Sequence, residues 1–394
     1  MSLPRSCDIF CTVVDNYGDI GVCWRLARQL AHEYGLLVRL WVDDLHSFGK
    51  LCPELDAKLE VQTCRGVEVI HWSEGVFANP LPQPSLPASG PGAGVADLVI
   101  EAFACKLPQS YIEAMAACER KPVWINLEYL SAEDWVEGCH QLPSPHPILP
   151  LTKYFFFPGF TEKTGGLLIE GGLLERRDAF LSDDAAQAEY WHSLGVPEQQ
   201  AGELRVSLFS YENAAITPLL QAWAQGAAAV RCLLPEGRAV PQVAAFFGQA
   251  GARAGAVWQR GSLTVHVLPF VEQPEYDRLL WACDVNFVRG EDSCVRAQWA
   301  ARPFIWQIYP QHDGVHRVKL EALRRLYTAD LSADAADAVR ELWLAWNGGR
   351  EVATAWGGFI AQRDELTRHG RNWAQHLSAN NLALNLLDFS SRVD

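Results

Sequence analysis

The chain has 394 residues, of which 33 are Lys or Arg and 47 are Asp or Glu, and its formal net charge is -14. At about 150 residues per domain, this length predicts two domains, and 49% hydrophobic residues are enough for globular cores. The acidic balance argues against nucleic acid as a partner, because nucleic-acid binding needs clustered Lys and Arg.

The eleven cysteines include no Cys-x-x-Cys spacing, so we interpret them as reduced thiols of a cytoplasmic protein. No hydrophobic signal core follows Met1–Arg5, and no apolar stretch approaches roughly 18 residues, so neither secretion nor a membrane span is expected. His312 and His316 stand four apart, but Gly314 interrupts the run and no zincin acid lies between them. We therefore expect no metal site.

Strand-length apolar runs recur through the first half, separated by helical or turn-rich segments. The predicted strands are Cys7–Val14, Leu37–Val42, Val67–Trp72, Asp97–Glu101 and Val123–Leu127, and the predicted helices are Ile20–Tyr34 and Leu107–Glu119. Strands that alternate with helices predict an α/β fold with a parallel, doubly wound sheet.

The turn Asp15–Gly21 joins the first strand to the first helix and carries two acids, Asp15 and Asp19. Ligands of open parallel sheets gather at the carboxyl ends of strands. A dinucleotide fold would place phosphate-binding glycines here, whereas two carboxylates would repel a pyrophosphate, so the turn is expected to face a neutral or cationic group. The alternative is structural: Asp15 caps a turn, Asp19 is the helix N-cap, and Gly18 and Gly21 only allow the bend.

The segment from Pro143 to Gly172 is rich in Pro, Gly and aromatic residues, including Tyr154–Phe160 and Thr164–Gly166. We place the interdomain connection there, and its aromatic residues favour a packed crossing over a flexible, polar linker. A cleft is expected beside it.

The second half repeats the alternation of strands and helices. The predicted strands are Leu204–Phe209, Val230–Leu234, Leu263–Leu268, Asp284–Val288 and Phe304–Trp306, and the predicted helices are Asn213–Gln225, Pro241–Ala250, Pro274–Ala282 and Ser293–Ala301. The stretch from about Ala333 is predicted to be helical and to pack across both halves.

The turn Arg289–Ser293 leads from a predicted strand into a predicted helix and contains Gly290. With Asp292 or Ser293 as the N-cap, the backbone N–H groups of the helix would favour a diphosphate, and Arg289 would add a cation. The alternative is that Asp292 only caps the helix and Arg289 pairs with Glu291 on the surface.

Aromatic residues stand at two further strand ends of the second half. Phe270 and Gln273 follow one predicted strand, where a planar base could rest on the ring and hydrogen-bond to the amide. Phe209 and Tyr211 stand at the end of another predicted strand, Leu204–Phe209. The alternative for each aromatic residue is ordinary packing.

Seven segments together resemble the bacterial elongation factor P arginine rhamnosyltransferases, in the order of that family. They are Asp15–Val22, Trp24–Arg28, Trp41–Asp44, Glu128–Glu133, Phe157–Phe160, Gly165–Leu167 and Arg289–Ser293. The resemblance implies a GT-B fold, in which two Rossmann-like domains face a cleft. It divides the chain into an acceptor-binding domain over 1–170, a nucleotide-sugar-binding domain over 171–365 and a C-terminal helix over 366–394 that returns to the first domain.

The resemblance further implies inverting transfer of rhamnose from TDP-β-L-rhamnose to an arginine of elongation factor P, without a metal. It assigns the essential acids to Asp15, Asp19 and Glu291. The implied donor contacts are Phe209, Tyr211, Phe270, Gln273, Tyr276, Asp292 and Ser293, next to Arg289 and Gly290 of the same turn. Other functions remain open from the residues alone: an epimerase of nucleotide sugars, a glycosyltransferase with a small-molecule acceptor, or a non-catalytic nucleotide-sugar sensor.

Overall fold

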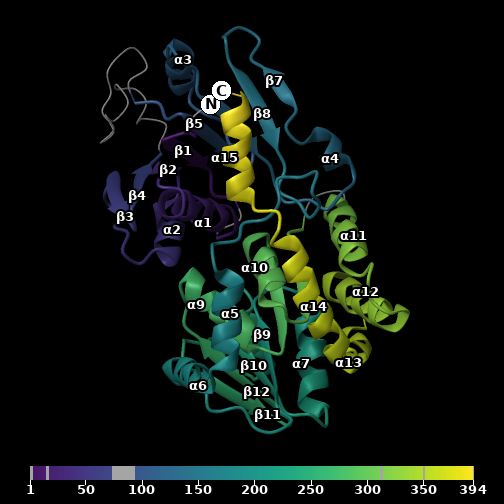
Figure 1. The fold of residues 1–394 in the computed structure, drawn as a ribbon. Coiled ribbons are helices and arrows are strands. Elements are labelled where there is room, and N and C mark those ends of the chain that lie inside the picture. Colours follow the sequence, from purple (N-terminus) through teal and green to yellow (C-terminus); the bar gives the residue numbers. More distant parts are fainter. Residues whose placement is uncertain (1–2, 15–16, 73–93, 311–313, 349–350, 394) are drawn as a thin grey trace. The chain divides into compact units, whose positions relative to one another are not determined.

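The computed structural model describes residues 3–14, 17–72, 94–310, 314–348 and 351–393. The chain divides into two compact units, each with its own sheet (Figure 1). Unit 1 comprises Met1–Gly171 and Leu377–Asp394, and unit 2 comprises Gly172–His376.

Unit 1 is built on an eight-stranded sheet with the order β3-β4-β2-β1-β5-β6-β8-β7. Its strands are β1 (Ser6–Cys11), β2 (Leu37–Val42), β3 (Val61–Cys64), β4 (Val67–His71), β5 (Leu98–Ala102), β6 (Val123–Leu127), β7 (Pro143–Pro145) and β8 (Thr152–Phe156). Its helices are α1 (Gly18–His32), α2 (Leu45–Leu51), α3 (Gln109–Ala117), α4 (Trp135–Cys139) and α15 (Leu382–Val393). The strands between the edges pair in parallel, whereas β3 and β7 are antiparallel to their neighbours.

The central strands of unit 1 are apolar and fully buried, as expected for a parallel sheet covered on both faces. A buried charge cluster around Asp8 lies within this core. Arg39 on β2 donates from Nε to Asp8 Oδ1 on β1 at 2.5 Å, and the Tyr111 hydroxyl on α3 donates to the same carboxylate. The cluster satisfies the buried charges and ties β1, β2 and α3 together.

Unit 2 contains a six-stranded sheet with the order β11-β12-β10-β9-β13-β14. Its strands are β9 (Leu204–Leu208), β10 (Val230–Pro235), β11 (Val257–Arg260), β12 (Leu263–Leu268), β13 (Val285–Arg289) and β14 (Phe304–Gln307). Its helices are α5 (Leu173–Ser182), α6 (Asp184–Ser193), α7 (Ile216–Gln225), α8 (Val240–Phe246), α9 (Gln273–Ala282), α10 (Asp292–Ala300), α11 (Val315–Tyr327), α12 (Ala333–Gly348), α13 (Val352–Ala361) and α14 (Arg363–Leu377). Among these strands only β11 runs antiparallel to its neighbour within the described residues.

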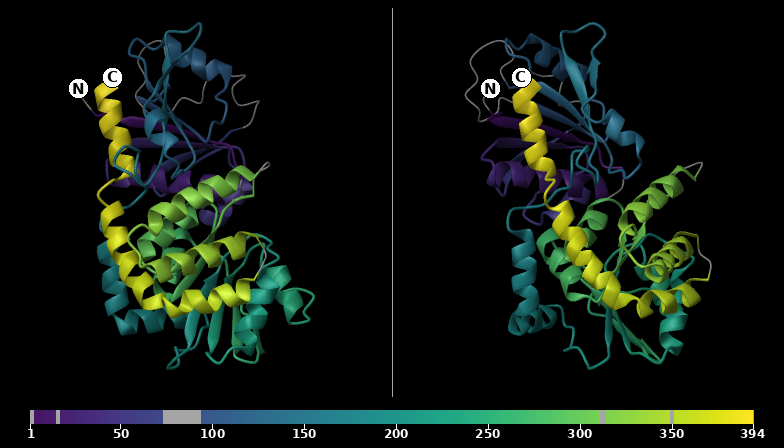
Figure 2. Two further views of the ribbon diagram at one scale, coloured as in Figure 1. Left: turned by 90° about the vertical axis from the view of Figure 1, so that its right-hand side faces the viewer. Right: turned by 45° about the vertical axis from the view of Figure 1, so that its right-hand side comes forward.

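The C-terminal helices belong to different units, and Figures 1 and 2 show them in yellow. In unit 2, Trp373 of α14 donates from Nε1 to Gln298 of α10. In unit 1, the residues before α15 bond to the segment after β8: Leu167 donates its N–H to Asn380 O at 3.1 Å, and Leu382 donates its N–H to Leu167 O at 3.0 Å. A Cβ on Gly166, which has φ +77°, would lie 2.2 Å from Asn380 O, so only glycine permits this close approach.

The predicted fold class is confirmed as α/β, with two sheets of mainly parallel strands and a C-terminal helical segment. No strand was predicted within Pro143–Gly172, whereas β7 and β8 form an antiparallel pair there that completes the sheet of unit 1. Two further strands, β3 and β11, were also missed. All but β8 are edge strands with mostly exposed or half-buried residues, so they lack the apolar runs that mark the central strands.

Candidate active site

The β1–α1 turn of unit 1 contains the first pair of predicted acids. Asp15 lies outside the described residues. Asp19 lies in the first turn of α1, is 3% exposed, and accepts a hydrogen bond from the Val14 N–H at 2.8 Å through Oδ2. Tyr17 is the N-cap, without a side-chain capping bond, so the alternative that made Asp19 the N-cap is wrong. A carboxylate in this position is favoured by the N-terminal end of the helix dipole.

A second carboxylate supports the same turn. Asp43 follows β2 and accepts the Val13 N–H at 2.9 Å, so two acids hold consecutive amides after β1. The pKa of the nearby Cys11 thiol is raised mainly by its hydrogen bond with Cys23 and by burial. The charges of Asp19 and Asp43 raise it further. Asp43 was not predicted as a site residue, because its place beside Val13 follows only from the pairing of β1 with β2.

The β13–α10 turn of unit 2 is dominated by a cation between aromatic rings. The Arg289 side chain is 5% exposed, and its Cζ lies 4.6 Å from the ring centroid of Phe209 and 4.4 Å from that of Tyr211. The Phe209 ring in turn meets Tyr276 of α9 at 5.6 Å. The structure thus brings Phe209, Tyr211, Tyr276 and Arg289 together at the carboxyl ends of β9 and β13.

The starts of α9 and α10 lie next to this aromatic cluster. Gln273 at the start of α9 donates from Nε2 to Asp292 Oδ2 at the start of α10, at 3.5 Å. Phe270 is half-buried in the connection that leads from β12 to α9. Burial raises the pKa of the Tyr276 phenol.

The N-terminus of α10 differs from the sequence expectation. Its N-cap is Glu291, whose side chain makes no capping bond, and not Asp292 or Ser293. The Ser293 hydroxyl instead donates to Arg289 O and accepts the Arg289 N–H at 3.3 Å. Gly290 adopts φ +64°, the left-handed conformation that glycine favours, and its carbonyl accepts from Trp306 Nε1 at 2.7 Å.

A buried ion pair fixes α9 against α10. Arg296 of α10 donates to both carboxylate oxygens of Asp277 on α9, at 2.8 and 2.7 Å, and both side chains are buried. Such a bidentate pair holds its two helices in one relative orientation. It therefore keeps Gln273 and Asp292 in place at the two helix starts.

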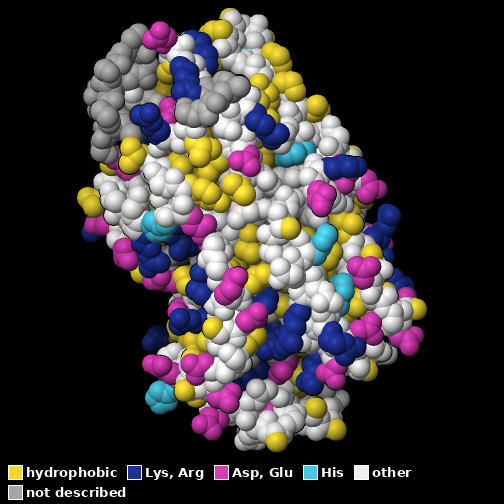
Figure 3. Space-filling view, viewed as in Figure 1, with side chains coloured by type: hydrophobic (Ala, Val, Ile, Leu, Met, Phe, Trp, Pro, Cys, Tyr) yellow, Lys and Arg dark blue, Asp and Glu magenta, His cyan; other side chains and the backbone are white. Residues whose placement is uncertain are grey.

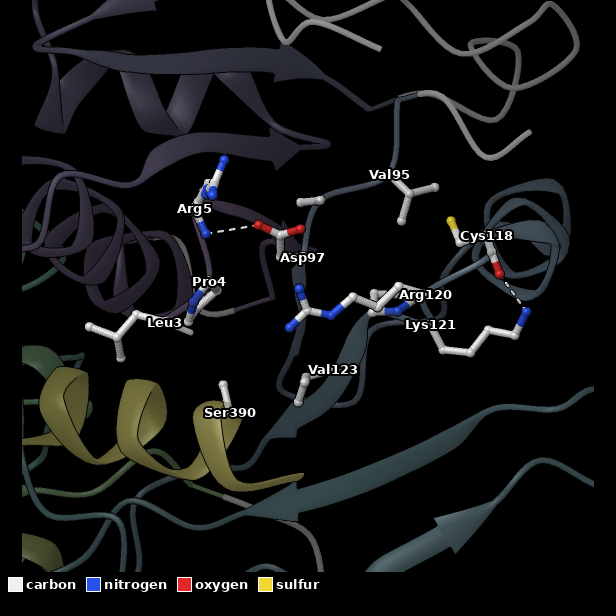
Figure 4. A pocket seen from close by; sticks show the side chains of 12 residues that line it. Leu3, Pro4, Arg5, Val95, Asp97, Cys118, Arg120, Lys121, Val123 and Ser390 are labelled. Atoms are coloured by element: carbon white, nitrogen blue, oxygen red, sulfur yellow. Dashed lines mark hydrogen bonds between the residues drawn. The ribbon is translucent and has the colours of Figure 1, made fainter. Parts of the chain in front are cut away.

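A hollow of about 350 Å³ in unit 1 lies at the amino ends of β1, β5 and β6, whereas the β1–α1 turn lies at the carboxyl end of β1 (Figure 4). It is lined by Arg5, Arg120 and Lys121, next to Asp97. Lys121 donates to the carbonyls of Ala116, at 2.8 Å, and Cys118, and Arg5 donates its main-chain N–H to Asp97 at 2.8 Å. The two guanidinium groups point in different directions in Figure 4, so they do not form one anion site.

The described residues add three observations, on surface charge, on metal binding and on membrane spanning. Basic and acidic side chains are interspersed over the face drawn in Figure 3. Within the described part of the chain, no group of three or more His, Cys, Asp or Glu side chains could hold a metal ion, and His312 lies outside that part. None of the helices described is both long and apolar enough to cross a bilayer.

The fold is that of a glycosyltransferase of the GT-B type. A solved glycosyltransferase from Rickettsia africae aligns with a TM-score of 0.51 at 8% identity, over 99% of this chain and 98% of that one, which bears on the fold alone. A closer match, to a structure described as the basis for EarP-mediated arginine glycosylation of translation elongation factor EF-P, has a TM-score of 0.69 and 37% identity over 98% of this chain and 99% of the other. The protein is therefore an enzyme of the glycosyltransferase class with a GT-B type of fold.

The family follows from the sequence comparison. Residues 7–391 match the model of the Elongation-Factor P (EF-P) rhamnosyltransferase EarP family, and the chain belongs to that family. It is 50% identical to a protein-arginine rhamnosyltransferase of Pseudomonas putida over 97% of both chains, and 49% identical to one of Pseudomonas aeruginosa over 98% of both chains. The resemblance described from the sequence is confirmed.

Proposed function

We propose that the enzyme transfers rhamnose from TDP-β-L-rhamnose, with inversion, to an arginine side chain of elongation factor P. The observation that carries this proposal is the match of nearly the whole chain to proteins that are named protein-arginine rhamnosyltransferases. The two turns support it, since the acids of the unit 1 turn suit a cationic acceptor and the buried guanidinium of Arg289 suits an anionic donor.

In this proposal unit 2 binds the donor. The helix N-terminus of α10, with Arg289, holds the diphosphate, because backbone N–H groups and a guanidinium both favour negative charge. Phe209, Tyr211, Phe270 and Tyr276 supply aromatic surface for the thymine and the deoxyribose, and Gln273 hydrogen-bonds to the base. Asp292 and Ser293 complete the turn, and Gly290 lets the donor approach the backbone closely.

The β1–α1 turn of unit 1 binds the acceptor arginine. A guanidinium has a pKa above about 12, so its nitrogen is a poor nucleophile until a proton is removed. Asp19 holds the fork of the guanidinium and accepts this proton, and Asp15 supports Asp19 or its loop. Glu291 orients the sugar.

The reaction is a single in-line displacement. A guanidinium nitrogen forms the bond to the anomeric carbon while the bond from that carbon to the diphosphate oxygen breaks, and the bonding electrons leave with TDP. The proton passes to Asp19. No enzyme nucleophile is required, and Arg289 with the α10 N-terminus would stabilise the leaving diphosphate without a metal.

The reaction is proposed to occur in the cytoplasm. All eleven cysteines are free thiols, which fits a reducing compartment. The elongation factor acceptor would be met in the same compartment.

Mass spectrometry of the acceptor tests this function. The purified enzyme is incubated with TDP-β-L-rhamnose and elongation factor P, and one added deoxyhexose on an arginine is the expected result. Release of epimerised nucleotide sugar would indicate an epimerase instead, transfer only to a small molecule would indicate a different acceptor, and donor binding without any transfer would indicate a sensor. A Glu291→Gln variant is expected to lose turnover, and normal turnover in this variant would remove Glu291 from the mechanism.

A further inference from the structure

Two stacked aromatic rings lie at the carboxyl edge of the unit 1 sheet, and they were not among the predicted site residues. Phe103 follows β5 and Tyr129 follows β6, and their ring centroids lie 4.6 Å apart with an interplanar angle of 18°. Both side chains are half-buried. We call this pair the aromatic ledge.

The sheet places the aromatic ledge beside the Asp19 turn. β5 pairs with β1, and β6 pairs with β5. The register aligns Phe10 with Glu101 and Ala102 with Leu127, so the segments that follow β1, β5 and β6 leave the sheet at one level. Adjacent strands lie about 4.8 Å apart, so a side chain after β5 is one strand away from the turn after β1.

The backbone under the aromatic ledge is held in an unfavourable conformation. Phe103 and Ala104 are consecutive non-glycine residues in the left-handed region, with φ of +56° and +55°. Three hydrogen bonds fix the turn: Phe103 N–H to Leu127 O at 2.7 Å, Ala104 N–H to Asn126 Oδ1 at 3.2 Å, and Cys105 N–H to Ala102 O at 3.1 Å. Such strain persists where the surroundings over-determine it, and it clusters at functional sites.

A carboxylate accompanies the aromatic ledge. Asn126 of β6 also donates from Nδ2 to Glu128 Oε1, and Glu128 directly precedes Tyr129 in the chain. The carboxyl edge of β1, β5 and β6 therefore combines negative charge with aromatic surface. This combination suits a planar cation.

We propose that the Phe103 ring packs on the flat face of the acceptor guanidinium while Asp19 holds its edge. This inference rests on the proposed function. A guanidinium presents hydrogen-bond donors around its edge and a weakly hydrated face that stacks on aromatic rings. Tyr129 is a positioning residue, because its ring backs that of Phe103. Phe103 thereby favours arginine over lysine, whose ammonium group has no flat face to stack.

The experiment compares Phe103→Leu, which removes the aromatic face and keeps apolar volume, with Phe103→Tyr, which keeps the face. In steady-state transfer to elongation factor P, Phe103→Leu is expected to raise the acceptor KM by about 2- to 30-fold, the range of a cation–π contact. The KM for TDP-rhamnose stays unchanged. Phe103→Tyr is expected to keep both constants near those of the wild type, and Phe103→Met replaces Phe103→Leu if the latter melts at a lower temperature.

Two results would overturn this inference while leaving the proposed function intact. One is a wild-type acceptor KM in folded Phe103→Leu or Phe103→Met. The other is an equal rise in acceptor KM for Phe103→Tyr, which would show that shape and not the aromatic face matters. If the wild-type enzyme transfers no rhamnose to arginine, the proposed function itself fails.

Discussion

The turn after β1 in unit 1 and the turn after β13 in unit 2 both lead from a buried parallel strand into a helix, but they differ in their charged side chains. The first carries acids, whereas the second combines Arg289 with Glu291 and Asp292. In the first, Asp19 and Asp43 bond to consecutive backbone amides. In the second, Arg289 lies between the rings of Phe209 and Tyr211. The fold thus supplies the same kind of site twice, and the side chains decide which charge each site accepts.

Glycine use also differs between the two turns. Gly18 and Gly21 are part of α1, where the helical conformation does not require glycine. Gly290 has φ +64° and does favour glycine. Of these glycines, only Gly290 therefore has a backbone conformation that favours glycine, and it lies in the turn where we place the diphosphate.

The largest expected effect is that of Asp19→Asn. Asparagine can still accept the Val14 N–H but cannot take a proton, so kcat for transfer should fall by about 100-fold or more. The matched control is Glu54→Gln, which neutralises a 58% exposed side chain paired with Arg65, and it should leave kcat unchanged. Transfer by Asp19→Asn within a few-fold of wild type would refute the assignment of Asp19 as the base.

Arg289→Met should weaken TDP binding by about 10- to 150-fold, the worth of one or two hydrogen bonds to a charged group. Arg289→Lys should not rescue it, since an ammonium does not stack between two rings as a guanidinium does. Arg278→Met is the control, because Arg278 is 49% exposed on α9 and pairs only on the surface with Glu275 in the part of the chain described. Calorimetric titration with TDP measures all three, and equal affinities for Arg289→Met and wild type would remove the cation from the donor site.

Gly290→Ala should lower the free energy of unfolding by about 1–2 kcal/mol, because the left-handed conformation is costly for alanine. It should also weaken TDP binding through the displaced turn. Gly357→Ala, on α13 with open space around the added Cβ, should instead stabilise the protein by about 0.5–1 kcal/mol. Denaturant unfolding measures both, and an unchanged stability of Gly290→Ala would contradict the strain argument.

The smallest expected effect is a loss of stability in mild acid, to which one buried histidine in each unit contributes. Burial lowers the pKa of His140 in unit 1 to about 4, and burial with the nearby Arg231 lowers that of His266 in unit 2 to about 4. Each histidine is neutral in the folded state but protonates near pH 6.5 when the chain is unfolded. Its contribution to the free energy of unfolding is therefore fully present above that pH and is lost as the pH falls towards 4. Each should cost roughly 1 kcal/mol at pH 5.5.

Comparison of wild type with His140→Gln and His266→Gln by denaturant unfolding at pH 7 and pH 5.5 isolates this effect. Burial raises the pKa of Glu101, so this residue makes the protein more stable as the pH falls. The informative quantity is therefore the change in the free energy of unfolding between pH 7 and pH 5.5, compared between each variant and the wild type. A change in both variants equal to that of the wild type would refute the effect.

The sequence predicted the parts of the fold that local pattern controls. The buried strands of both sheets and the helices after β1 and β13 have apolar periodicity that marks them. The edge strands β3, β7 and β11 lack it, and their pairing depends on distant neighbours.

The candidate site also contains residues that a local motif predicts and residues that only strand pairing places. The acid turn and the Arg289 turn are contiguous motifs, and the resemblance named their residues. The alternative that made Asp19 an N-cap and the N-cap expected at Asp292 or Ser293 were both wrong, because Tyr17 and Glu291 take these positions. Asp19 and Ser293 instead bond to backbone groups nearby. Asp43 and Phe103 were missed, because each reaches its place only through the pairing of strands.

The β1–α1 turn is proposed to bind the acceptor and the β13–α10 turn the donor, and paired binding measurements test this assignment most directly. The affinities for TDP and for elongation factor P are measured by calorimetry on Asp19→Asn and on Arg289→Met. We predict that Asp19→Asn keeps wild-type TDP affinity and loses acceptor affinity, while Arg289→Met does the reverse. Loss of TDP binding in Asp19→Asn, or loss of acceptor binding in Arg289→Met with TDP affinity retained, would contradict this assignment.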